Sequence, residues 1–214
     1  MKKYLFAELS VAFLFVMTAI WLLPKHVAIA IGVLLVPLLF LLSWYIRPEE
    51  QPTPFLEYLG IQPQDFSQAK AMTIWAVAGI AAMLVLASVL CPNFANEPNF
   101  WEKLFKQFRG YILWAFVQQM LLLGYFANRL EGLLTDKRRA AVAAGALFAI
   151  AHIPNPVLMP VTAIFGGAGV WFFLKSRNAY LATLFHALLG TAVKYLLANP
   201  LLDHGMRVGP GFWR

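Results

Sequence analysis

The chain of 214 residues is 61% hydrophobic and only 13% charged, with a mean hydropathy of +0.68, whereas soluble domains are about 45–50% apolar and about 25% charged. This composition excludes an ordinary soluble protein and predicts an all-α, polytopic helical bundle embedded in a membrane. The net charge of +7 does not indicate nucleic-acid binding, because the basic residues are scattered over the ends of the apolar stretches, where membrane helices carry cationic flanks.

Six apolar stretches are long enough to cross the roughly 30 Å hydrocarbon core of a bilayer as helices. They are Tyr4–Leu23, Val27–Ile46, Met72–Leu90, Tyr111–Asn128, Val157–Leu174 and Ala179–Leu197. A seventh stretch, Ala140–His152, is too short to cross alone. We therefore predict about seven transmembrane helices in a single membrane-embedded domain, residues 1–214.

Two connecting segments are more than simple linkers. In the segment 98–110, PNFWEKLFKQFRG, aromatic residues and leucine recur at helical spacing while Lys103, Lys106 and Arg109 occupy the other face. This pattern is typical of a helix lying in the bilayer interface. The segment 47–66 contains four prolines that break any long helix, so we predict a loop with one short surface helix around Phe55–Leu59.

The distribution of basic residues predicts the orientation in the membrane. If the N-terminus is cytoplasmic, ten of the 17 basic residues lie on the cytoplasmic side, and the loop Arg129–Arg139 contains the densest cluster. The positive-inside rule therefore favours a cytoplasmic N-terminus. We expect an integral protein of the bacterial inner membrane, with the lipid bilayer as a partner and no nucleic acid.

Polar side chains within the apolar stretches are candidates for function, because they are costly inside a bilayer. The main ones are Gln118, Gln119, His152 and His186, with Asn155 shortly after His152. A helical rise of about 1.5 Å per residue places Gln118, His152 and His186 within several ångströms of one another in depth. The sequence therefore predicts that these groups face a common cavity.

The sequence IPNP after His152 predicts irregular backbone below the membrane surface, which is tolerated only where protein buries it or where it lines a water-containing cavity. Two interpretations remain open: His152 belongs to a functional cavity, or it only satisfies a backbone carbonyl at the end of a helix. A metal ion would need a third protein ligand beside His152 and His186. Only Asn155 or a glutamine is near, so we expect no metal and no cofactor.

Three segments of the chain resemble motifs of the CPBP family, which contains the type II CAAX prenyl endopeptidases and bacteriocin-processing and immunity proteins. The segment FAIAH matches the motif Phe-x-x-x-His through Phe148 and His152. The segment HALLG matches the next motif through His186, with Gly190 where asparagine is usual. The segment QQMLLLGY is similar to the family's Glu-Glu motif, but has glutamine at both glutamates, Gln118 and Gln119, and leucine at the arginine, Leu123. The CPBP-like core covers about residues 111–197.

The resemblance implies an intramembrane protease that acts on a membrane-embedded or lipidated peptide. In the family, the first glutamate and the second-motif histidine are thought to activate water, and third-motif residues stabilise the oxyanion. Here the implied catalytic residues are His152, His186, Gln118 and Gln119, supported by Asn155, Phe148 and Gly190. A glutamine cannot accept the proton that a glutamate base would take.

Three functions therefore remain open. The first is a weak or atypical intramembrane protease in which a histidine is the base. The second is a catalytically silent member of the family that acts as a membrane scaffold, binding or immunity protein. The third, a small transporter or lipid-binding bundle, has less support because the sequence shows no inverted repeat and no paired charges within the spans.

Overall fold

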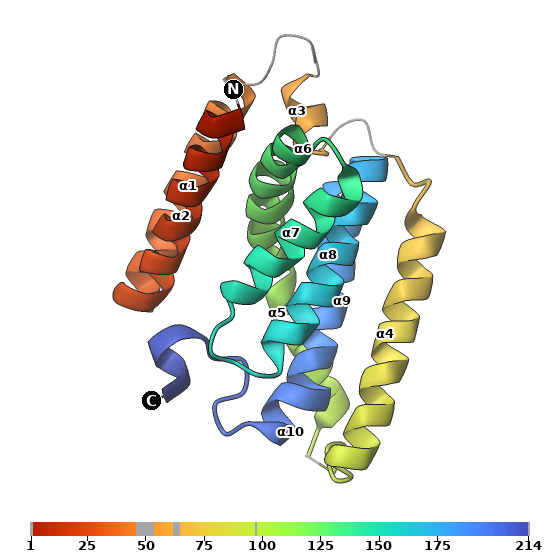
Figure 1. The fold of residues 1–214 in the computed structure, drawn as a ribbon. Coiled ribbons are helices and arrows are strands. Elements are labelled where there is room, and N and C mark those ends of the chain that lie inside the picture. The colour runs from red at the N-terminus through yellow and green to blue at the C-terminus, as the bar shows by residue number, and fades with distance from the viewer. Residues whose placement is uncertain (1, 46–53, 62–64, 97, 214) are drawn as a thin grey trace.

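The regular structure of the chain is helical, as predicted, in a computed structural model that describes residues 2–45, 54–61, 65–96 and 98–213 (Figure 1). The described part contains no β-strand. Its α-helices are α1 Lys2–Leu22, α2 Lys25–Tyr45, α3 Phe55–Tyr58, α4 Ala69–Leu90, α5 Phe100–Gln119, α6 Asn128–Leu134, α7 Lys137–Ile150, α8 Leu158–Ser176, α9 Ala179–Val193 and α10 Asn199–Leu201. Two π-helical segments, η1 Met120–Ala127 and η2 Lys194–Ala198, continue α5 and α9, and a 3-10 helix, η3, spans Gly209–Trp213.

Five helical segments of the described chain are long and apolar enough to cross a membrane. They are Lys2–Leu22, Ala69–Leu90, Phe100–Leu134, Leu158–Ser176 and Ala179–Leu201. Helix α7 has 14 residues and is too short, as predicted, and the short helix near Phe55 is also present as α3. The protein is therefore an integral membrane protein, although the predicted number of seven spans is not confirmed.

The segment predicted as an interfacial helix is instead the beginning of α5. Helices α5, η1 and α6 form one continuous helical segment of 35 residues, about 52 Å long at 1.5 Å per residue. Phe100, at its start, is buried and packs edge-on against Phe94 and Tyr195, with ring centroids 6.0 and 5.9 Å away. Lys194 also donates a hydrogen bond to Gln107 Oε1 over 2.7 Å. These contacts with η2 and with the turn before α5 hold the first turns of α5 in line with the span.

Helices α7 and α8 approach each other backbone to backbone. A Cβ atom added to Gly145 would lie 2.5 Å from the carbonyl oxygen of Ala163, and one added to Gly166 would lie 2.7 Å from the ring of Phe148. Glycine is therefore required at these positions, because any side chain would push the two helices apart. This close contact fixes α7, and with it Phe148, against α8.

A polar network ties several helices together at the end of the bundle that holds the N-terminus. Arg129 is buried and forms an ion pair with Glu8 of α1 over 2.9 Å, and Tyr125 donates a hydrogen bond to the same carboxylate over 2.9 Å. Arg177, after α8, donates to Asn128 Oδ1 and to Glu131 Oε2. The network joins α1 and the α8–α9 turn to α6.

The order of the helices separates two ends of the bundle. Figure 1 shows the N-terminus, α3 and the α6–α7 turn at one end, and the α4–α5 connection and α10 at the other. A single cysteine at Thr135 and one at Asn96, each in a background with Cys91→Ser, should therefore lie on opposite sides of the membrane. Both positions are exposed, so each should react with a thiol reagent that reaches it.

An impermeant maleimide applied to intact cells should label only one of the two cysteines, and both should react after the cells are permeabilised. Labelling of both positions from outside would contradict the topology of the 35-residue helix that separates them.

Candidate functional site

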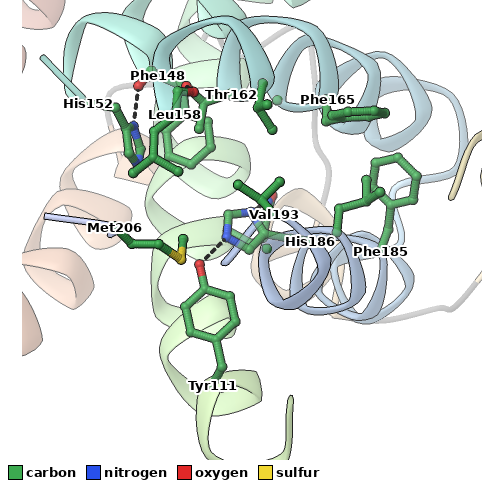
Figure 2. Close-up of a pocket in the computed structure, with 15 residues that line it drawn as sticks. Tyr111, Phe148, His152, Leu158, Thr162, Phe165, Phe185, His186, Val193 and Met206 are labelled. Carbon is green, nitrogen blue, oxygen red and sulfur yellow. Dashed lines mark hydrogen bonds between the residues drawn. The ribbon is translucent and has the colours of Figure 1, made fainter. Parts of the chain in front are cut away.

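Helices α5, α7, α8 and α9 and the segment after α10 enclose a cavity of about 50 Å³ (Figure 2). This volume has room for a few water molecules. It is far below the 300–1,000 Å³ typical of sites for larger ligands. The cavity is therefore too small for a peptide, which fits only after part of the wall moves.

Of Gln118, His152 and His186, which the sequence predicted to face a common cavity, the two histidines do so and Gln118 does not. His152, His186 and Gln119 line the cavity, together with Phe148 and Gly190. The other two predicted site residues, Gln118 and Asn155, lie outside its wall.

His186 is held on both of its ring nitrogens. Its Nδ1 lies 2.7 Å from Gln119 Nε2, and its Nε2 lies 2.9 Å from the hydroxyl of Tyr111. An amide nitrogen only donates, so Nδ1 accepts and carries no hydrogen. In the neutral ring the hydrogen is then on Nε2, which donates to the Tyr111 oxygen. The Tyr111 hydroxyl in turn donates to Gln118 Oε1 over 3.1 Å.

These four side chains form one directed chain of hydrogen bonds from Gln119 through His186 and Tyr111 to Gln118. Each bond fixes the direction of the next, because a hydroxyl and a neutral imidazole each have a single hydrogen to donate. Gln118, which is half-buried, is thus connected to the cavity through Tyr111. The two adjacent glutamines of the sequence have different partners and occupy opposite ends of the chain.

Gln119 has a further, unused hydrogen-bonding atom. The residue is 3% exposed, and within the described residues its Oε1 has no hydrogen-bond partner. A buried acceptor without a partner costs about 1–3 kcal/mol. Gln119 therefore offers an acceptor at the cavity wall to a donor that enters the site.

His152 lies just after the last turn of α7, and its Nδ1 is 2.6 Å from the carbonyl oxygen of Phe148. Because a carbonyl only accepts, Nδ1 carries the hydrogen and the neutral ring keeps its free electron pair on Nε2. The ring of Phe148 contacts both imidazoles, with centroids 4.7 Å from His152 and 5.7 Å from His186. Both interpretations left open by the sequence therefore apply, since His152 satisfies a backbone carbonyl and also lines the cavity.

Asn155 fastens the irregular backbone that follows α7. It is fully buried, and its Oδ1 accepts hydrogen bonds from the backbone of Val157 and Leu158 at the start of α8, over 3.1 and 2.9 Å. Its Nδ2 donates to the carbonyl oxygens of Gly205 and Arg207, over 2.8 and 3.0 Å. The side chain thus joins the α7–α8 connection to the segment after α10.

The segment after α10 closes one side of the cavity. Gly209 donates a backbone hydrogen bond to Ile153 over 2.8 Å, and the side chain of Met206 is part of the cavity wall (Figure 2). Met206 carried no sequence signal. Tyr111 carried a weak one, because it precedes Gln118 by seven residues and so lies two turns away on the same face of α5.

The polar side chains of the cavity wall are the imidazoles of His152 and His186, the amide of Gln119, the phenol of Tyr111 and the hydroxyl of Thr162. Within residues 2–45, 54–61, 65–96 and 98–213, no three His, Cys, Asp or Glu side chains gather closely enough to hold a metal ion. Among the residues that the structure describes, no carboxylate lines the cavity wall.

The fold and the site define a polytopic helical membrane protein in which two imidazoles, one from the turn after α7 and one from α9, face one intramembrane cavity. The model of the family "Type II CAAX prenyl endopeptidase Rce1-like" matches residues 79–192, which is more than half of the chain. The chain belongs to this family, within the CPBP proteins that its motifs resemble. Comparisons with curated proteins and with solved structures give no match.

The bonds of Asn155 predict a large structural effect of its removal. Asn155→Ala leaves two carbonyl oxygens and two backbone N–H groups without their partner. The free energy of unfolding should therefore fall by at least about 2 kcal/mol. A clear drop in the melting temperature in detergent should follow.

Asn93→Ala is the matched control, because Asn93 is exposed and its side chain accepts a single hydrogen bond, from Asn96. The Asn93→Ala substitution should change the free energy of unfolding by no more than about 0.5 kcal/mol. Equal melting temperatures of the two variants would contradict the structural role of Asn155.

Proposed function

We propose that the protein is an intramembrane endopeptidase that cleaves a membrane-embedded or lipidated peptide, with His152 as the general base. The observation that carries the proposal is the hydrogen bond from His152 Nδ1 to the Phe148 carbonyl, which leaves the free electron pair of Nε2 on a ring that lines the cavity. Membership in the type II CAAX prenyl endopeptidase family supports the same reaction class.

The proposed reaction begins with a water molecule between His152 and the peptide carbonyl. His152 Nε2 takes a proton from the water as its oxygen bonds to the carbonyl carbon. The resulting oxyanion is stabilised by hydrogen-bond donors of the site, of which His186 Nε2–H is the first candidate, donating to the oxyanion in place of the Tyr111 oxygen. His152 then gives its proton to the leaving nitrogen as the C–N bond breaks, which releases a carboxylic acid and an amine.

Gln119 suits the positioning of the substrate backbone. Its Oε1 is the buried acceptor without a partner in the described residues, and a peptide N–H is the donor that a substrate brings. This second hydrogen bond would orient the scissile carbonyl toward His152. In the proposed site, Gln119 therefore binds and orients the substrate and Gln118 accepts the hydrogen bond of Tyr111, at positions where the family has glutamates.

In the described part of the chain no carboxylate lines the cavity wall, and this sets the expected rate of cleavage. A positioned general base typically contributes about 10²–10⁴-fold. A site in which His152 acts without a carboxylate partner should therefore turn over slowly. The same observation favours a second candidate function, in which the protein is catalytically silent and the site only binds a membrane-embedded or lipidated peptide, as a scaffold or immunity protein does.

We also infer that the N-terminus is cytoplasmic, in a bacterial inner membrane. The end of the bundle that holds the N-terminus also carries the turn between α6 and α7, with the basic residues 137–139, and positive charge favours the cytoplasmic side. With this orientation, Asn96→Cys is the variant that reacts with an impermeant reagent in intact cells.

The assay that tests the proposed function uses the purified protein in liposomes with fluorescent transmembrane and prenylated reporter peptides. The wild-type protein should cleave at least one reporter slowly, and His152→Ala should lower kcat about 10²–10⁴-fold. His204→Ala is the control and should keep the wild-type rate, because His204 itself does not line the cavity.

Binding of a reporter without cleavage would support the second candidate function, a catalytically silent binding protein. That outcome is photo-crosslinking of a reporter to the wild-type protein with no product after prolonged incubation. Equal cleavage by wild type and His152→Ala would instead exclude His152 as the base.

Restoring a carboxylate tests the origin of the slow rate. Gln119→Glu is nearly isosteric and places a carboxylate at the cavity wall, whereas Gln118→Glu places one beside the Tyr111 hydroxyl, outside that wall. Cleavage should therefore rise more for Gln119→Glu, by up to about 10²–10⁴-fold.

Gln107→Glu, on the same helix but bonded to Lys194, is the matched control and should change nothing. If the wild-type protein cleaves a reporter in a His152-dependent way and no glutamate variant cleaves it faster, the glutamines are parts of a working site of different design and not the remains of a disarmed base.

A further inference from the structure

Tyr111 reaches the cavity across the contact between α5 and α9. Its hydroxyl lies 2.9 Å from His186 Nε2 and 3.1 Å from Gln118 Oε1, and its ring lies 5.8 Å from the imidazole of His186. No motif of the sequence singles out this residue. It is nevertheless the link through which the two glutamines of the site are connected.

Gly190 makes this position of Tyr111 possible. A Cβ atom added to Gly190 would lie 2.7 Å from Tyr111 Cε1, closer than two carbon atoms can approach. A side chain at residue 190 would therefore displace the tyrosine ring. Gly190 and Tyr111 together fill the space beside His186, with the ring coming from α5 in place of a side chain from α9.

Tyr111 also lines a second hollow. That hollow, of about 420 Å³, lies beside α5 and is lined by Lys103, Lys106, Gln107, Gly110, Tyr111, Trp114 and Tyr195. The tyrosine is the residue common to the walls of both spaces. Its ring forms part of each wall, and its hydroxyl bonds to His186.

We propose that Tyr111 is a positioning residue that holds His186 as the Nε2–H tautomer, and that Gly190 is present to admit it. This inference rests on the proposed function for its consequence, because a neutral His186 with its hydrogen on Nε2 is the donor that the oxyanion requires. The tautomer of His186 can nevertheless be measured without any cleavage assay.

The directions of the hydrogen bonds explain how the tyrosine acts. Gln119 donates to Nδ1, and the Tyr111 oxygen is free to accept from Nε2 because its own hydrogen goes to Gln118. Without the hydroxyl, the hydrogen on Nε2 has no acceptor there and Gln118 Oε1 loses its donor. The ring of His186 is then held on one side only, so it can turn or exchange its tautomer.

Nitrogen NMR of the protein labelled with ¹⁵N-histidine in detergent or nanodiscs tests the proposal. The chain has four histidines, and the signals of His186 are those that disappear in His186→Gln. In the wild-type protein, Nδ1 should resonate as a bare nitrogen and Nε2 as a protonated one. In Tyr111→Phe, which keeps the ring, the two resonances should move toward each other as the tautomers exchange.

Tyr180→Phe is the matched control, because Tyr180 is an exposed tyrosine of α9 that stacks on Phe116 and does not line the cavity. Its His186 signals should equal those of the wild-type protein. A protonated Nδ1 in the wild-type protein, or unchanged His186 signals in Tyr111→Phe, would overturn the proposal.

Gly190→Ala tests the second part of the inference. The added methyl group should displace the Tyr111 ring and change the His186 signals in the same way as Tyr111→Phe. The double variant Gly190→Asn, Tyr111→Ala should restore them in part, because an amide from residue 190 then occupies the vacated space. Unchanged signals in a folded Gly190→Ala protein would contradict the role of Gly190. If that variant fails to fold, Tyr111→Phe still decides the role of the tyrosine.

The activity of the same variants separates this inference from the proposed function. In liposomes, Tyr111→Phe should lower kcat about 5–10-fold with little change in KM, as expected for the loss of one hydrogen bond that orients a reacting group. Altered His186 signals without cleavage by any variant would support the positioning role and reject the peptidase. Unaltered His186 signals with normal cleavage would reject the positioning role of Tyr111 and support the peptidase.

Discussion

Inside a bilayer no water is available to satisfy amides, hydroxyls and imidazoles, so these groups must find partners within the chain. The arrangement around the cavity follows from this constraint. His186 bonds to side chains of α5, and Asn155 uses its whole amide group to hold the backbone on either side of it. The irregular backbone after α7 is stable at this depth because the segment after α10 supplies its partners. Polar bonds thus determine which helices meet at the site.

Much of the fold was predictable because a bilayer imposes a minimum length on a helix that crosses it. The short α7 and the small helix α3 follow from apolar length and from proline positions. It was not predictable in this way that the segment expected in the interface would be the beginning of the spanning helix α5. An amphipathic pattern fits a helix that lies in the interface as well as one that continues a span. The outcome depends on the packing of Phe100 against Tyr195, a contact between residues far apart in the chain.

The sequence predicted the depth of the site residues in the membrane but not the directions in which their side chains point. The rise of a helix places His152, His186 and Gln118 at one level, but depth alone does not say which of two adjacent glutamines, pointing about 100° apart, lines the cavity. Gln119 does. The contributions of Tyr111 and Met206 depend on the approach of α9 and of the segment after α10, respectively. The spacing of nearby residues does not show which distant segments will contact each other, and so these two residues were missed.

The segment that carries Met206 has a consequence for the biosynthesis of the protein. It follows all the helices that line the cavity, so the ribosome makes it after them, and chains begin to assemble from the N-terminus. Its Gly209 packs against Ile20 of α1, where an added Cβ would come within 3.0 Å. Early and late parts of the chain therefore meet at this wall. The enclosure of His152 and His186 is completed only after the membrane helices have been made.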